Sequence, residues 1–189
     1  MRQGLSLFLP FLALVLVCAT QARAGTINGV TLPGTVQVGN TTLQLNGMGL
    51  RTKFMVKVYV AGFYLPQKSS DPAAILKSDT PKRIVLHFCR DVSKDQLTGG
   101  FAESFHNNSP DAENILKPDI ERLFAALEPV KQDEEIVFTY LPGEGTSVVQ
   151  GGKDKLAISG SAFAEMLFSV WLGPKPPNAS LKKGLMGQP

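Results

Sequence analysis

The sequence predicts an α+β fold, in which a layer of helices covers one face of an antiparallel sheet. Long runs rich in β-branched and aromatic residues occur at residues 50–65 and 83–90. Three shorter runs separated by glycine-containing turns follow between residues 135 and 159, which is typical of an antiparallel meander. Amphipathic helical patterns are grouped between the second and third of these strand regions, and one more lies near the end of the chain.

The first 24 residues have the pattern of a signal peptide. Arg2 precedes an apolar run at residues 5–17, and Ala22-Arg23-Ala24 provides the small residues that a signal peptidase requires. The apolar run is too short for a stable membrane span. Cys18 lacks the small preceding residue of a lipoprotein signal, so lipidation is not expected. We therefore expect cleavage near Ala24 and a periplasmic or secreted protein.

Residues 25–189 are expected to form one domain, because single cores commonly contain roughly 100–200 residues. The whole chain has a formal net charge of +3, and removal of the leader takes two arginines with it. The nearly neutral remainder argues against a nucleic-acid partner, which would require a strongly basic face. Cys89 is the single cysteine after the leader, so packing must stabilise the domain without an internal disulfide.

Residues 50–65 are predicted to form one central strand. Alternation along the strand predicts one apolar face, made of Phe54, Val56, Val58 and Val60. The opposite face then contains Arg51, Lys53, Met55, Lys57 and Tyr59. An arginine on such a face can hold an anionic oxygen through two hydrogen bonds, and Tyr59 adds an O–H donor. The alternative is an ordinary solvated sheet face.

Capping signals predict where the helices begin. Asp71 followed by Pro72 predicts the start of a short helix, and Ser93 with Gln96 predicts the capping box of a longer one. The last long helix is predicted over residues 160–172 and is apolar on nearly all sides. That composition suits a helix between the sheet and a ligand cleft, and it equally suits a helix that is simply buried.

Other motifs give no signal for a cofactor or a metal, and we expect neither. His87 and Cys89 share one face of the second strand, which would suit a nucleophilic pair, but no acidic partner is evident and we favour core positions for both. Gly47-Met48-Gly49 lacks the pattern of a phosphate loop, although its glycines allow a sharp bend or a close approach. Gly151-Gly152-Lys153 is followed by Asp154, so it is not a Walker motif.

Two segments resemble the chalcone isomerase family. GMGLRTKFMVKVYVAGFYLP resembles the family's Gly-x-Gly-x-Arg element and the strand after it, through Gly47, Gly49, Arg51, Lys53, Phe54, Gly62, Tyr64 and Leu65. WLGPKPPNASLKKGL is similar to the end of the family's last helix, with its proline-containing loop and Ser-Leu-Lys. The resemblance spans most of the chain after the leader and identifies an exported, bacterial type of member. It implies an open-faced sandwich, with a large antiparallel sheet, a helical layer and a few small strands.

The resemblance implies two kinds of function. In the plant enzymes an arginine holds the substrate phenolate, while a threonine and a tyrosine position a water molecule against the ketone, so that proximity and charge placement catalyse a cyclisation. Arg51 matches that arginine, Tyr59 stands at the threonine position, and Gln96 or a neighbour takes the place of the catalytic tyrosine. In the non-catalytic members an arginine and a tyrosine hold the carboxylate of a fatty acid. Arg51 with Tyr59 is closer to that pair.

We therefore expect an exported protein that binds a small apolar anion, such as a fatty acid or an aromatic acid, between sheet and helices. Arg51 would hold the anionic group and Tyr59 would assist. The alternative is an intramolecular lyase acting on a chalcone-like or other unsaturated substrate, with the same two residues in its site. A third possibility is a structural or partner-binding domain, which would have a filled core without a ligand cavity.

Overall fold

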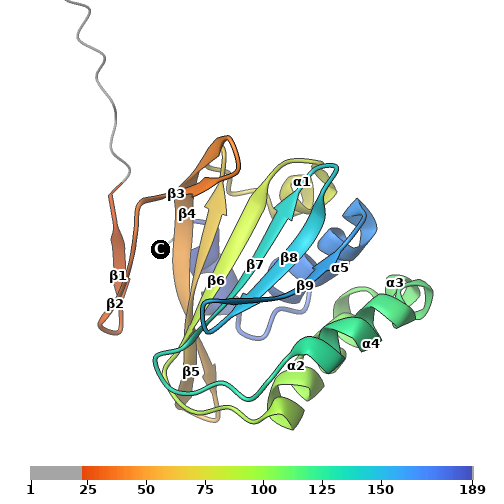
Figure 1. Ribbon diagram of the computed structural model, residues 1–189. Helices are drawn as coiled ribbons and strands as arrows, with labels where there is room; N and C mark the ends of the chain where they lie inside the picture. Colours follow the sequence, from red (N-terminus) through yellow and green to blue (C-terminus); the bar gives the residue numbers. More distant parts are fainter. Residues whose placement is uncertain (1–22, 189) are drawn as a thin grey trace, which may run out of the picture.

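The structure is a computed structural model that describes residues 23–188, so most of the predicted signal peptide lies outside the described residues. In the described part, seven strands form one antiparallel sheet in the order β3-β4-β5-β6-β7-β8-β9 (Figure 1). The strands are β3 (Thr35–Val38), β4 (Thr41–Lys53), β5 (Val56–Leu65), β6 (Lys82–Phe88), β7 (Glu135–Leu141), β8 (Gly145–Gln150) and β9 (Lys153–Ile158). The predicted α+β class and the predicted meander are both confirmed.

Helices pack against one face of this sheet and bury its larger apolar core (Figure 1). They are α1 (Pro72–Lys77), α2 (Lys94–Asn108), α3 (Pro110–Ile115), α4 (Lys117–Ala126), α5 (Ser161–Leu172) and α6 (Ala179–Leu185). α2 packs against α5, and aromatic side chains fill the space between them and the sheet. No helix within residues 23–188 combines the length and the apolar composition that crossing a bilayer requires.

The predicted capping signals are present. Asp71 Oδ1 accepts hydrogen bonds from the backbone N–H groups of Ala73 and Ala74 at 3.0 and 3.1 Å. Ser93 Oγ accepts from the backbone N–H of Gln96, and Gln96 Oε1 accepts from the backbone N–H of Ser93. These bonds satisfy N–H groups that have no partner within the helix, so each helix begins where the sequence indicates.

A small hairpin covers part of the opposite face of the sheet. Its strands are β1 (Gly25–Ile27) and β2 (Val30–Leu32), which pair with each other and enclose a second, smaller core. Tyr64 lies in that second core, and its hydroxyl donates to the carbonyl oxygen of Pro33 at 3.0 Å. The few small strands that the family resemblance implies therefore lie outside the main sheet.

The prediction of one continuous strand over residues 50–65 is wrong. β4 ends at Lys53 and β5 begins at Val56, because Phe54 and Met55 form the turn of a β-hairpin with φ values of 49° and 64°. Turns of this kind need positive φ at both central residues and usually contain Asn-Gly. A Phe-Met pair gives no such signal. Phe54 is also 90% exposed, whereas the alternation placed it on the buried face.

Helix α6 lies directly on the backbone of β4. A Cβ added at Gly47 would overlap the carbonyl oxygen of Gly184 and would come within 2.7 Å of the backbone nitrogen of Gly187. Asn46 fixes the same contact, because its side-chain amide donates to the carbonyl oxygen of Leu185 at 2.8 Å. The expectation of a close backbone approach at this glycine motif is therefore confirmed, and the neighbour is the C-terminal helix.

We expect Gly47→Ala to lower the free energy of unfolding by about 1–3 kcal/mol. The new methyl group would overlap backbone atoms, which cannot move aside by a change of rotamer as a side chain can. Urea denaturation followed by circular dichroism measures this change. Gly99→Ala is the matched control, because no described atom beyond its chain neighbours and the backbone of its own helix lies within 4 Å of its added Cβ, and alanine favours helices by up to about 1 kcal/mol. Equal stabilities of wild type and Gly47→Ala would contradict the packing of α6 on β4.

Candidate ligand-binding site

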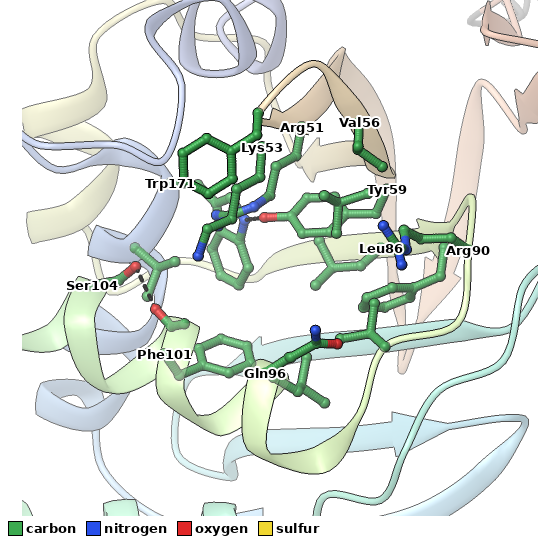
Figure 2. A pocket seen from close by; sticks show the side chains of 17 residues that line it. Arg51, Lys53, Val56, Tyr59, Leu86, Arg90, Gln96, Phe101, Ser104 and Trp171 are labelled. Carbon is green, nitrogen blue, oxygen red and sulfur yellow. Dashed lines mark hydrogen bonds between the residues drawn. The ribbon is translucent and has the colours of Figure 1, made fainter.

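A cavity of about 340 Å³ lies between the β4–β5 hairpin, the end of β6, and helices α2 and α5 (Figure 2). Its walls are mostly apolar and include Val58, Leu86, Phe88, Leu97, Phe101 and Val170. Small-molecule sites in proteins commonly have volumes of about 300–1,000 Å³, so this cavity is large enough for a small ligand. The third possibility raised by the sequence, a filled core between sheet and helices, does not match this arrangement.

The hairpin brings Arg51 and Tyr59 together. The two residues are direct partners across β4 and β5, while the next pair joins Thr52 to Lys57. Val58 is therefore an extra residue on β5, and this β-bulge lets Val58 and Tyr59 both line the cavity although they are adjacent in sequence. The sequence placed Arg51 and Tyr59 eight residues apart along one strand. In the structure they meet across the turn.

Positive charge surrounds the mouth of the cavity. Arg51 and Lys53 extend into it from the hairpin in Figure 2, and Arg90 lines it from the end of β6. No aspartate or glutamate is among the described residues that line the cavity, and no carboxylate of residues 23–188 forms a salt bridge with Arg51 or Lys53. Cations beside low-dielectric walls attract anions more strongly than cations in open solvent do. The cavity therefore favours an anionic ligand.

Tyr59 is a buried and neutral hydrogen-bond donor in this site. Its hydroxyl oxygen accepts a hydrogen bond from Trp171 Nε1 at 2.9 Å, and the Arg51 guanidinium carbon lies 5.8 Å from the centre of its ring. Burial raises the pKa of Tyr59, and the nearby Arg51 charge and the Trp171 hydrogen bond oppose that rise only in part. The phenol is thus protonated at neutral pH, and the bond from Trp171 does not use its O–H proton.

Sequence reasoning missed three residues of the site. Trp171 lies in the last long helix, for which the sequence indicates only an apolar composition. The available signal was its indole N–H, because buried tryptophans usually hydrogen-bond that group. Arg90 follows β6, and Ser104 lies on α2 with its hydroxyl donating to the carbonyl oxygen of Gly100 at 2.8 Å. Gln96, which the family resemblance singled out, does line the cavity.

His87 and Cys89 do not line the cavity. His87 Nδ1 lies 3.3 Å from Glu135 Oε1 and its Nε2 lies 3.5 Å from Asp133 Oδ1, so the expectation that the histidine has no acidic partner is wrong. The reason is the pairing of β6 with β7, which places Glu135 directly opposite His87 and is not encoded in local sequence. Cys89 packs with the smaller core and accepts a hydrogen bond from Asn28.

Comparison with known proteins agrees with this fold. Residues 24–187 match the family described as chalcone isomerase-like. Among solved structures, the chain is similar to a fatty-acid binding protein from Arabidopsis thaliana, with a TM-score of 0.67 and 14% identity over 86% of this chain and 95% of the other. No curated protein sequence matches the chain. At this identity the structural likeness shows a shared fold, which confirms the predicted open-faced sandwich.

Replacing Tyr59 by Phe is expected to lower the free energy of unfolding by about 1–3 kcal/mol, because the buried Trp171 N–H would lose its acceptor. Chemical denaturation of Tyr59→Phe, Trp171→Phe and the double variant measures the coupling between the two side chains. The double variant should lose less than the sum of the two single losses. Strictly additive losses would show that the hydrogen bond between the two rings does not form.

Proposed function

The chain belongs to the chalcone isomerase-like family, and we propose that it binds a small amphipathic anion, such as a fatty acid, in the cavity beside Arg51. One observation carries the proposal. A half-buried guanidinium and a neutral phenol face the same apolar cavity, and no carboxylate among the described lining residues neutralises the positive charge. An anionic group with an apolar body matches both the charge and the walls.

The arrangement suggests how such a ligand is held. A guanidinium can donate two parallel hydrogen bonds to a carboxylate, and the Tyr59 O–H can donate a third. The apolar body would lie against the strand side chains Val58, Leu86 and Phe88 and against Phe101 of α2. Lys53 and Arg90 would raise the local concentration of anions at the mouth.

The structural comparison supports a fatty acid as the first ligand to test. The similar Arabidopsis thaliana protein is described as a fatty-acid binding protein, and it has the same fold. An aromatic acid also combines an anionic group with an apolar body, so it is a second ligand that fits the proposal. Binding also requires fewer groups than catalysis. A lyase would need a side chain that acts on the substrate ketone. Gln96 stands where the resemblance implies the catalytic tyrosine, and its amide, unlike a phenol, has no proton that it can give up by ionising.

We expect hexadecanoate to bind the purified chain in calorimetric titration. Arg51→Ala should weaken binding by about 10- to 100-fold, which corresponds to the free energy that a hydrogen bond to a charged group contributes. Arg51→Lys should bind with intermediate affinity, since lysine keeps the charge but cannot form two parallel bonds. Arg122→Ala is the control, because Arg122 lies on α4 outside the cavity lining and pairs with Asp119. Unchanged affinity in Arg51→Ala would contradict the role of Arg51.

The lyase alternative is tested with the same samples. Incubation with a chalcone should leave its absorbance unchanged if the site only binds its ligand. Loss of chalcone absorbance that disappears in Arg51→Ala would instead favour an intramolecular lyase. Mass spectrometry of an extract from the denatured protein identifies any lipid that co-purifies.

We also propose that the chain is exported and cleaved after Ala24, which rests on the leader pattern of the sequence alone. Expression in a bacterial host should yield a periplasmic protein whose mass corresponds to a chain beginning at Gly25. Ala24→Asp should keep the leader, because the peptidase requires a small residue at that position. A wild-type chain recovered from the cytoplasm at full mass would refute export.

A further inference from the structure

The tip of the β4–β5 hairpin exposes three consecutive apolar side chains to solvent. Phe54 is 90% exposed, Met55 98% and Val56 43%. Among residues 23–188 the fourth large apolar side chain with this degree of exposure is Ile115 on α3, which stands alone. The tip therefore carries three of the four most exposed large apolar side chains of the described chain, in consecutive positions.

Folding requirements do not explain these residues. Phe54 and Met55 both have positive φ, a backbone conformation that side-chain-bearing apolar residues rarely adopt and that Asn-Gly would adopt with less strain. Neither side chain gains burial in return. Backbone strain and exposed apolar side chains at the same place indicate a functional or interaction site.

Cations flank the apolar tip on both sides. Lys53 and Lys57 are exposed, and the Lys53 ammonium lies 6.0 Å from the centre of the Phe54 ring. Lys57 Nζ donates to the side-chain oxygen of Asn28, a neutral partner that leaves the charge in place. Neither lysine forms a salt bridge with a carboxylate of the described residues. Apolar side chains next to lysines are typical of segments that bind the surface of anionic membranes.

The tip is also part of the cavity wall. Lys53, Phe54 and Val56 all line the cavity, so its mouth opens beside the exposed side chains. Figure 1 shows the hairpin reaching the lower end of the sheet. A tip seated in a lipid surface would thus bring the mouth of the cavity to that surface.

We propose that residues 53–57 insert into the surface of an anionic lipid bilayer, with Phe54 and Met55 among the upper acyl chains and Lys53 and Lys57 at the phosphates. An amphipathic anion then moves between bilayer and cavity without crossing open water. This transfer rests on the proposed function, whereas the membrane contact does not. A protein partner is the less favoured occupant, because three side chains are far too few for a stable interface of about 1,200–2,000 Å².

Tryptophan fluorescence at the tip tests the insertion directly. Phe54→Trp in the chain beginning at Gly25, which lacks the apolar leader, is mixed with vesicles of equimolar phosphatidylglycerol and phosphatidylcholine, and its emission should shift to the blue and be quenched by brominated lipid. Ile115→Trp is the matched control, since it places tryptophan at the exposed apolar site away from the tip, and its emission should not shift. Trp171 is 1% exposed and adds the same background to both proteins. An unshifted Phe54→Trp spectrum would overturn the proposal.

A second variant separates membrane binding from folding. Phe54→Asn combined with Met55→Gly installs the pair that the turn prefers, so the melting temperature should stay the same or rise. Sedimentation with the same vesicles should fall by roughly tenfold or more, because the apolar contact is lost. Lys53→Gln combined with Lys57→Gln should weaken binding to anionic vesicles by roughly fivefold for each lysine, and binding to pure phosphatidylcholine much less.

The outcomes also distinguish this proposal from the proposed function. Met55→Gly alone should bind hexadecanoate as the wild type does, because Met55 does not line the cavity and Arg51 and Tyr59 are unchanged. Absence of binding of both hexadecanoate and an aromatic carboxylate in the wild type would refute the proposed function and leave the vesicle result standing. Wild-type sedimentation by the folded Asn-Gly variant would refute the membrane proposal, as would a Phe54-dependent protein partner in a chain that binds no vesicles.

Discussion

The hydrogen bond from Trp171 to Tyr59 joins the helical layer to the sheet at the place where the two separate around the cavity. Trp171 lies in the last turn of α5, and Tyr59 lies beside the β-bulge of β5. Because both side chains are buried, the bond fixes the phenol in position and burial keeps it neutral. The positive charge of Arg51 is then held beside a donor whose orientation does not depend on a ligand.

Most of the fold could be predicted because its signals are local. The caps at Asp71 and Ser93 satisfy backbone N–H groups within three residues, and the meander has glycines in its turns. The hairpin at Phe54 and Met55 was not predictable in this way, since its residues suit a strand and its turn runs against their backbone preference. Contacts with the rest of the fold, and not the local preferences of these residues, make this segment a turn.

The site was predictable only in part, for a related reason. Arg51 and Tyr59 both came from an alternation argument that assumed one strand over residues 50–65, and the family resemblance pointed to the same pair. Trp171 and Ser104 lie on helices far along the chain, and the packing of those helices around the cavity is what brings them to the site. Such convergence depends on the register of the sheet and the contact between α2 and α5, neither of which is encoded near the residues concerned.

The pairing of Arg51 with Tyr59 across the hairpin has a consequence for how this protein can change. Their spacing is set by the hydrogen-bonded ladder, the bulge and the length of the turn. A substitution at Met55, which does not line the cavity, therefore leaves this pair in place as long as the turn keeps its length. Over evolutionary time, selection can alter the surroundings in which the protein meets its ligand without altering which ligand it accepts.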